Sequence, residues 1–297
     1  MIWFVTGSSR GLGREIVLAA LERGDRVAAT ARKPAQLDDL AAKYGDRLLA
    51  LPLDVTDPQA VDEAVAAAVT AFGTLDVVVN NAGWADTSAF EDTPADNFRA
   101  QVETNFFGVV NVTRSVVPIL REQGHGSLIN VSSIGGRLGV PGLSAYQAAK
   151  WAVNGFTEVI SQELAPLGVR VTTIEPGGMV TDWGGSSMAI PPISEPYRQS
   201  VGAMVERLRH AGHKPLGDPV KVAQVIVRLV EMDEPPIRLL LGSDALNGAQ
   251  YAARTTAERD AAYRELSRST DRDDATAQER DPLGQALSTT PDGDAAA

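Results

Sequence analysis

Tyr146 and Lys150 are the two residues of this chain whose types and spacing most directly suggest chemistry. They lie four positions apart in a segment with a helical pattern, so both side chains are expected on one helix face, one turn apart. A phenol with a pKa of about 10 is a poor acid–base group near neutral pH, but a nearby ammonium lowers that pKa. The pair could therefore exchange a proton with a carbonyl or alcohol oxygen, whereas Tyr-x-x-x-Lys alone also fits an ordinary helix-surface pair.

Hydroxyl groups stand at the end of a predicted strand upstream of this pair. Ser132 and Ser133 follow the apolar run Ser127–Val131. Ligands of open α/β sheets bind outside the carboxyl ends of the strands. A serine at this place could therefore hydrogen-bond the oxygen that exchanges a proton with Tyr146.

A glycine-rich turn follows the first predicted strand. The residues Thr6-Gly7-Ser8-Ser9-Arg10-Gly11-Leu12-Gly13 lead from that strand directly into a helical pattern. Glycines let the backbone approach a pyrophosphate, and the free N–H groups and dipole of a helix N-terminus favour an anion. The turn therefore predicts a dinucleotide cofactor, with a ligand-free strand–helix turn as the alternative.

The charges near the end of the second predicted strand bear on the choice of cofactor. Proteins that hold an adenosine 2′-hydroxyl usually place an Asp or Glu there. This chain instead has Ala31 followed by Arg32 and Lys33, and Arg10 lies in the glycine-rich turn. Because a guanidinium can bind a 2′-phosphate with two hydrogen bonds, we expect NADP(H) to be favoured over NAD(H). The alternative is that Arg10, Arg32 and Lys33 are solvated surface residues that bind no phosphate.

The elements that must position these residues alternate between short apolar runs and longer amphipathic stretches. The predicted strands are Ile2–Thr6, Arg26–Ala31, Leu48–Pro52, Val77–Asn80, Ser127–Val131, Arg170–Glu175 and Ile237–Leu241. The predicted helices are Gly13–Arg23, Leu37–Tyr44, Pro58–Phe72, Pro94–Gln123, Ala145–Leu167 and Pro219–Glu231. Strands without polar alternation are typical of a sheet covered on both faces, and strand–helix alternation predicts right-handed crossovers. The expected fold is a single α/β domain of the Rossmann type, a doubly wound sheet of about seven parallel strands flanked by helices on both faces.

Three segments lie outside this alternation. Residues 181–219 form a long connection rich in Gly, Pro, Ser and Met, within a domain predicted to span residues 1–245. Residues 246–267 are expected to form a C-terminal helical extension. Residues 268–297 are polar, acidic and poor in apolar side chains, so a disordered tail is expected there.

The composition limits the possible partners and sites. With 44% hydrophobic residues, the chain of 297 residues can bury one large core. Its net charge of −11 disfavours nucleic acids and anionic membranes as partners, although residues 271–297 contribute five of these charges. No metal site is expected, because the chain has no cysteine and His210 and His213 have no carboxylate at ligand spacing. The absence of a visible signal peptide or bilayer-long apolar run predicts a soluble cytoplasmic protein.

Taken together, the motifs resemble those of the short-chain dehydrogenase/reductase family, in its main single-domain branch. The matching positions, in the family's order, are Thr6–Gly13, Asp54-Val55, Asn80-Asn81-Ala82-Gly83, Asn105, Ser133, Tyr146, Lys150 and Pro176-Gly177. The match covers residues 1–242 and is greatest with bacterial reductases similar to 17-beta-hydroxysteroid dehydrogenases. The resemblance implies an oxidoreductase that transfers a hydride between NADPH and a ketone, aldehyde or secondary alcohol.

The resemblance also implies a role for each matching residue. Tyr146 would be the general acid/base, Lys150 would lower its pKa and bind the nicotinamide ribose, and Ser133 would bind the substrate oxygen. Asn105 would hold a water that relays protons to Lys150, or would have a structural role alone. The other expected cofactor-binding residues are Gly7, Ser9, Arg10, Gly11, Leu12, Gly13, Arg32, Asp54, Val55, Asn81, Ala82, Gly83, Pro176, Gly177 and Thr181.

The substrate is expected to be small and hydrophobic. Residues 181–219 lie where the family has its substrate lid, and they include Trp183 and Met188. The apolar residues of this lid could equally cap the core. Trp84, directly after Asn-Asn-Ala-Gly, departs from the family pattern and either lines the site or covers the sheet edge. Glu175, before Pro176, is also less usual than a small or apolar residue.

Two other functions fit parts of the pattern. A non-catalytic NADP-binding regulatory protein would share the glycine-rich turn, but it would not need Ser133, Tyr146 and Lys150 together. An epimerase or dehydratase of the extended branch would use the same Tyr–Lys pair, but that branch usually has another glycine spacing and a sizeable C-terminal substrate domain. The resemblance further implies a homodimer or homotetramer built on the two long central helices.

Overall fold

Seven parallel strands form the central sheet of the structure, a computed structural model that describes residues 1–180, 188–210 and 215–281. The side chains of Met188 and of residues 208–210 are also outside the description. The strands of this sheet are β1 (Ile2–Val5), β2 (Arg26–Ala31), β3 (Leu48–Pro52), β4 (Val77–Asn80), β6 (Gly126–Val131), β7 (Val169–Pro176) and β9 (Arg238–Leu241). Their order across the sheet is β3-β2-β1-β4-β6-β7-β9. The order reverses between β1 and β4, which is where doubly wound sheets place a ligand crevice.

Both faces of the sheet are buried, as the unbroken apolar runs predict. Alternate residues of a strand point to opposite faces. Thus Trp3 and Val5 of β1 belong to one core cluster, while Phe4 between them belongs to the other. All three side chains are fully buried.

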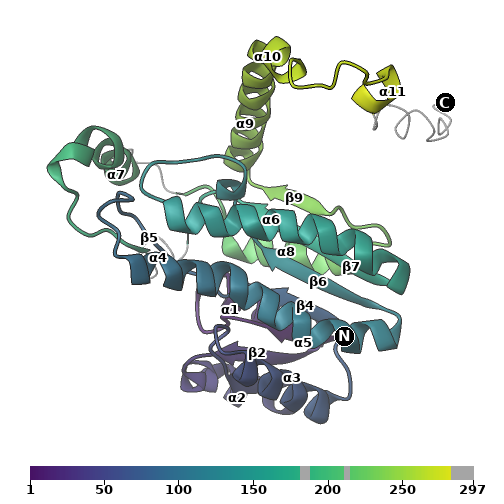
Figure 1. Cartoon of the computed structure of the whole chain (residues 1–297). Helices are drawn as coiled ribbons and strands as arrows, with labels where there is room; N and C mark the ends of the chain where they lie inside the picture. The colour runs from purple at the N-terminus through teal and green to yellow at the C-terminus, as the bar shows by residue number, and fades with distance from the viewer. Residues whose placement is uncertain (181–187, 211–214, 282–297) are drawn as a thin grey trace, which may run out of the picture. The chain divides into compact units, whose positions relative to one another are not determined.

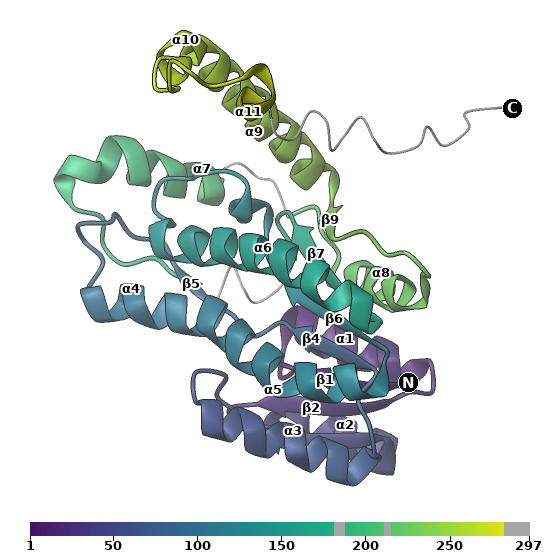
Figure 2. The same cartoon turned by 45° about the vertical axis from the view of Figure 1, so that its right-hand side comes forward.

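Helices cover each face and complete the predicted three-layer fold, which is confirmed. The helices of the sheet region are α1 (Gly11–Glu22), α2 (Asp38–Tyr44), α3 (Pro58–Phe72), α4 (Ala95–Val102), α5 (Gly108–Gln123), α6 (Ser144–Leu164) and α8 (Pro219–Glu231). The core cluster on one face takes its helical residues from α1, α2 and α8, and the cluster on the other takes them from α3, α5 and α6. Figures 1 and 2 show α3, α5 and α6 side by side over their face. Among the described residues, no helix has the length and apolar character needed to cross a membrane.

The helix ends follow the local sequence. Asp57 caps α3, where its carboxylate accepts hydrogen bonds from the N–H groups of Gln59 and Ala60, and Pro58 occupies the first turn. The predicted helix Pro94–Gln123 is continuous, but between α4 and α5 it passes through a π-helical turn at Glu103–Phe107. Such turns are frequent at functional sites.

The segment after β7 contains elements that the sequence did not predict. Strand β8 (Met188–Ala189) pairs in parallel with β5 (Ala85–Asp86), which follows the Asn-Asn-Ala-Gly segment. Helix α7 (Ala203–His210) comes next. Because β5 and β8 are each two residues long, no period of apolar residues could reveal them.

The chain divides into two compact units, Met1–Ala249 and Gln250–Ala297, which are described separately. Helix α9 (Ser243–Ala262) begins in the first unit, and α10 (Arg264–Arg268) and α11 (Ala277–Arg280) follow in the second. Helix α11 lies within residues 268–297, where a disordered tail is expected. A capping box between Thr276 and Glu279 begins that helix, and Arg272 pairs with the Glu279 carboxylate. Residues 282–297 lie outside the described residues.

Candidate active site

The predicted reactive residues come together at the carboxyl end of β6. Tyr146 lies in the first turn of α6, and its hydroxyl is hydrogen-bonded to Ser133, two residues beyond β6. Lys150, one turn further along α6, places its Nζ 5.6 Å from the centre of the Tyr146 ring. Both side chains are buried, and Lys150 Nζ donates a hydrogen bond of 2.9 Å to the carbonyl of Val131. The three side chains therefore form one constellation at the Tyr146 ring and its hydroxyl, with Ser133 on the hydroxyl and Lys150 beside the ring.

Burial dominates the protonation of both residues in the free protein. Removal from water raises the pKa of Tyr146 to about 12, although the hydrogen bond with Ser133 acts in the lowering direction. Removal from water also lowers the pKa of Lys150 to about 8. Burial of the phenol therefore sets the direction of the Tyr146 pKa, which is opposite to the lowering expected from Lys150.

The two adjacent serines point to different partners. Ser132 donates a hydrogen bond of 3.2 Å to the backbone carbonyl of Lys150, so its hydroxyl supports α6. Ser133 accepts a 3.0 Å hydrogen bond from the N–H of Gly135 and contacts Tyr146. The geometry supports Ser133 as the serine that faces a substrate oxygen.

Asn105 lies in the π-helical turn and is fully buried. Its amide donates to the carbonyls of Trp84 and Gln101, at 2.7 and 2.8 Å, and its Oδ1 accepts from the N–H of Trp84 at 3.2 Å. A methyl group added to Gly83 would lie 2.6 Å from Asn105 Oδ1 and 3.6 Å from Lys150 Nζ. Asn105 therefore fixes the backbone beside Lys150, and its expected role in holding a water stays a prediction.

The glycine-rich turn is packed so closely that side chains would block it. A Cβ on Gly13 would lie 2.3 Å from the carbonyl oxygen of Gly7, and Gly7 and Gly11 have φ values of 67° and 54°. Ser9 and Arg10 belong to the same turn, whereas the side chain of Leu12 is buried in the core. Helix α1 begins behind the turn, and no side chain caps its N-terminus. Its first N–H groups are therefore available to an anion.

Asn81 supports this turn from the neighbouring strand. Its amide donates to the carbonyls of Thr6 and Gly7 at 2.9 and 3.1 Å. The hydroxyl of Thr6 in turn accepts from the N–H groups of Asn81 and Ala82 at 2.9 and 3.0 Å. The Asn81 side chain is thus committed to the shape of the turn, while Gly83 beyond it is exposed.

The residues expected at the adenosine end lie around the ends of β2 and β3. Arg32 and Asp54 line one hollow of about 490 Å³ together with residues of β3 and α3. Val55 is buried, and Asn111 on α5 donates a 2.9 Å hydrogen bond to its carbonyl. Sequence reasoning missed Asn111, because its partner is 56 positions away and nothing local marks the contact.

Pro176 is the last residue of β7 and Gly177 follows it, and both are held from β9 and α9. The N–H of Gly177 donates to the carbonyl of Leu241 at 3.0 Å, and the N–H of Gly178 donates to the Asp244 carboxylate at 2.8 Å. A Cβ on Gly177 would lie 2.2 Å from that carboxylate. Asp244, which sequence reasoning missed, therefore requires glycine at position 177. Thr181 lies outside the described residues.

Trp84 is anchored on the π-helical turn, where its indole N–H donates a 3.1 Å hydrogen bond to Thr104. Trp183 lies outside the described residues, and Met188 is described only by its backbone pairing with Ala85. The described lid residues form a small apolar cluster with Ala89, which lies outside the lid. The lid members of this cluster are Ile190, Ile193, Tyr197, Val201 and Val205.

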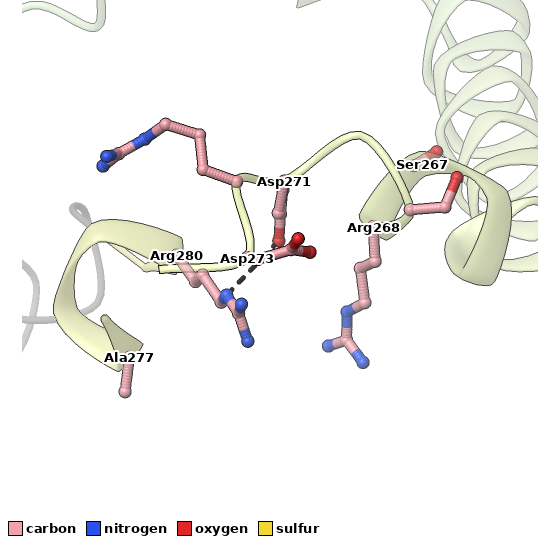
Figure 3. Close-up of a pocket in the computed structure, with 8 residues that line it drawn as sticks. Ser267, Arg268, Asp271, Asp273, Ala277 and Arg280 are labelled. Carbon is pink, nitrogen blue, oxygen red and sulfur yellow. Dashed lines mark ion pairs between the residues drawn. The ribbon is translucent and has the colours of Figure 1, made fainter. Parts of the chain in front are cut away.

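A larger hollow, of about 750 Å³, lies in the second unit and contains none of the predicted site residues. Figure 3 shows Arg268 and Arg280 next to Asp271 and Asp273, with an ion pair between Arg280 and Asp271. Arg272 and Arg280 of its wall are each paired with carboxylates, which leaves this hollow little positive charge for a phosphate. The glycine-rich turn and the Tyr146 constellation remain the candidate site.

Comparison with known sequences gives matches along most of the chain. The family model described as short chain dehydrogenase matches residues 1–189. Oxidoreductase BOA17 of Botryotinia fuckeliana is 52% identical over 90% of this chain and 97% of its own length. The 3-ketodihydrosphingosine reductase of Bacteroides thetaiotaomicron is 31% identical over 81% and 87%. A 3-alpha-(or 20-beta)-hydroxysteroid dehydrogenase of Mycobacterium tuberculosis is 38% identical over 60% and 70%.

Solved structures match the fold over the same region. A short-chain dehydrogenase from Streptomyces avermitilis superposes with a TM-score of 0.85, 37% identity and coverage of 91% of this chain and 99% of that one. A short chain dehydrogenase from Burkholderia cenocepacia in complex with NADP gives 0.69 at 28% identity, covering 89% and 96%. A 3-ketoacyl-(acyl-carrier-protein) reductase from Brucella melitensis complexed with NADH gives 0.70 at 25%, covering 82% and 98%.

Proposed function

The chain belongs to the short-chain dehydrogenase family, and from that premise we propose that this oxidoreductase transfers a hydride between NADPH and a hydrophobic ketone, aldehyde or secondary alcohol. Tyr146 acts as the general acid/base. The observation that carries the proposal is the hydrogen bond between Ser133 and Tyr146, with the Lys150 ammonium beside the same ring. This arrangement gathers a proton donor, a hydrogen-bond donor and a positive charge at the Tyr146 side chain.

The residues of the glycine-rich turn fit a dinucleotide. The uncapped N-terminus of α1 offers N–H groups to a pyrophosphate, and the close approach of Gly7, Gly13 and Asn81 keeps side chains away from it. Gly83 is exposed and has no side chain, so the space beside Lys150 is left for a ribose. When bound there, the nicotinamide supplies or accepts the hydride.

The proton chemistry falls to the chain's own side chains. In reduction, the Tyr146 hydroxyl gives its proton to the carbonyl oxygen as negative charge develops there, and Ser133 hydrogen-bonds the same oxygen. The Lys150 ammonium then stabilises the phenolate. In oxidation, the phenolate takes the proton from the alcohol. Because the pKa of Lys150 is about 8, its ammonium can both hold and release a proton near neutral pH.

The preference for NADP over NAD rests on charge. Arg10, Arg32 and Lys33 are exposed around the end of β2, and the strand ends in Ala31 rather than an acidic residue. Guanidinium groups there would bind a 2′-phosphate. We expect Arg32→Ala to weaken NADPH binding by about tenfold or more and NADH binding little, as measured by fluorescence titration. Equal losses for both cofactors would contradict this preference.

The hydrophobic substrate is inferred from the lid and supported by two relatives. The described lid residues present isoleucine, valine and tyrosine side chains next to β5. Two relatives are a 3-ketodihydrosphingosine reductase and a 3-alpha-(or 20-beta)-hydroxysteroid dehydrogenase. An assay of NADPH oxidation against ketones, aldehydes, quinones and steroids would identify the class accepted here.

The oligomer is inferred from exposed apolar side chains on the central helices. Phe107, at the end of the π-helical turn, and Trp151 and Val159 on α6 are 43%, 53% and 55% exposed. Such side chains on adjacent helices are typical of an interface. We propose a homodimer or homotetramer built on these helices, which light scattering on the purified protein would reveal.

The decisive experiment compares the protein with Tyr146→Phe. The variant should lose reduction of an accepted carbonyl by more than about a thousandfold, since no proton donor remains, while NADPH binding persists. Undiminished turnover in the variant would refute the mechanism. Tight NADPH binding without turnover of any substrate by the unchanged protein would instead favour a regulatory role.

A further inference from the structure

Glu175, the residue of β7 directly before Pro176, lies fully buried between two arginines. Its Oε2 accepts a hydrogen bond from Arg137 Nε at 2.8 Å and forms an ion pair with Arg137 Nη2 at 2.5 Å. Its Oε1 accepts from Arg238 Nε at 3.1 Å and Nη2 at 2.6 Å. A third donor, the amide of Asn154, lies 2.8 Å from Oε1. This carboxylate therefore joins three elements that are distant in the sequence.

Arg137 connects the Glu175 carboxylate to the loop that carries Ser133. The backbone of residues 133–137 forms a 3₁₀ turn, in which the N–H of Gly136 donates to Ser133 and the N–H of Arg137 donates to Ile134, each at 2.9 Å. Ser133 is therefore within one turn of the residue that Glu175 holds. A displaced Arg137 would carry the Ser133 hydroxyl with it.

Asn154 connects the same carboxylate to the helix that carries Tyr146 and Lys150. Its amide donates to the carbonyl of Gly136 at 3.0 Å as well as to Glu175. A Cβ on Gly136 would lie 2.4 Å from that amide and 2.9 Å from the carbonyl of Lys150. The loop therefore rests directly on α6, with no space between them for another side chain.

We propose that Glu175 is a positioning residue of the reaction, which clamps the Ser133 loop through Arg137 onto the face of α6 that presents Tyr146 and Lys150. The role rests on the proposed function, because a precise distance between Ser133 and Tyr146 matters only if a substrate oxygen binds both. Arg238 attaches β9 to the same carboxylate but belongs to no part of the loop.

The two arginines provide a matched pair of variants. Their side chains are 29% and 27% exposed, and each guanidinium approaches the Glu175 carboxylate with two of its nitrogens. Arg238 also lies 3.6 Å from Glu158. Arg137→Gln and Arg238→Gln each remove one charge from the network and leave Glu175 with the other arginine. These variants avoid the folding risk of Glu175→Gln, which would leave two arginines without their buried counter-charge.

The expected result is a kcat effect confined to the loop arginine. Arg137→Gln should lower kcat by about 10- to 100-fold with little change in the KM or Kd of NADPH, since displaced reacting groups cost rate rather than binding. Arg137→Lys, which restores the charge, should recover part of this loss. Arg238→Gln should keep kcat within about twofold of the unchanged protein. Its melting temperature should nevertheless fall by as much as that of Arg137→Gln. Equal kcat losses in both variants would overturn the proposal. An increase in the substrate KM of Arg137→Gln with kcat unchanged would also overturn it.

Hydrogen–deuterium exchange separates this inference from the proposed function. Amide exchange across residues 132–143 should become faster in Arg137→Gln and stay unchanged in Arg238→Gln, whether or not a substrate is known. Unchanged exchange in both variants would refute the clamp even in an active enzyme. Faster exchange in Arg137→Gln, in a protein that reduces none of the carbonyl compounds offered, would uphold the clamp and refute only the proposed function.

Discussion

Replacing Lys150 by methionine should stabilise the free protein while removing its activity. Lys150 is buried, and its pKa falls from 10.5 to about 8. A pKa lowered this far means that burial of the charged form costs about 3 kcal/mol. The variant also loses the hydrogen bond to the Val131 carbonyl, which stabilises the folded protein by about 1 kcal/mol. The free energy of unfolding of Lys150→Met should therefore be about 2 kcal/mol higher at pH 7.

The gain should depend on pH in a defined direction. Below pH 8 the ammonium is charged in both the folded and the unfolded chain, so its full burial cost is present. Between pH 8 and 10.5 the unfolded chain holds more protons than the folded one, so the free energy of unfolding of the unchanged protein rises with pH. Lys150→Met lacks this rise, and the difference between the two proteins should shrink. Tyr146 acts oppositely above pH 10, because its pKa is about 12 in the folded protein.

Urea unfolding of both proteins between pH 7 and 9.5 measures the effect below the range where Tyr146 contributes. Lys221→Met, on the exposed side of α8, is the matched control and should follow the unchanged protein at every pH. Parallel curves for Lys150→Met and the unchanged protein would show that Lys150 keeps its ordinary protonation in the fold, and would refute the argument from burial.

Two further substitutions test the phosphate turn and the sheet. Gly13→Ala should weaken NADPH binding more than about tenfold in a calorimetric titration, because its Cβ would lie 2.3 Å from the Gly7 carbonyl oxygen. The control is Gly155→Ala, where the added Cβ lies in open space on α6. That variant should leave NADPH binding unchanged and add about 1 kcal/mol to the free energy of unfolding. Asn130→Leu should cost about 2–3 kcal/mol in urea unfolding, because the buried Asn80 amide loses its 2.8 Å acceptor; a cost near zero would mean that this pair is dispensable.

The framework of the fold could be predicted because each element carries its own local signal. The predicted bounds of β2, β3, β4, α3 and α8 agree with the structure, since apolar runs and the Asp57-Pro58 cap mark them. The pairing of β5 with β8 could not be predicted in this way. It joins two-residue strands about a hundred positions apart, and only the folded chain brings them together.

The candidate site shows the same division. Motif spacing identified Tyr146, Lys150 and Ser133, which the structure brings together. Spacing did not reveal Asp244 or the arginines around Glu175, because their partners come from other elements. It also favoured a lowered pKa for Tyr146, whereas the pKa is raised, because the extent of burial is a property of the packed protein and not of the motif.

The π-helical turn at Glu103–Phe107 is a place where the central helix can change its length by one residue. A π turn holds about one residue more than an α turn, so loss of a residue there would restore a regular α turn. Because either kind of turn completes one rotation about the helix axis, the segments on both sides would keep their directions. Gln101 and Val112, both buried now, would still face the core together. Within α5, by contrast, loss of a residue would rotate the following segment by about 100°. One-residue length differences among natural variants of this helix should therefore fall at the π-helical turn.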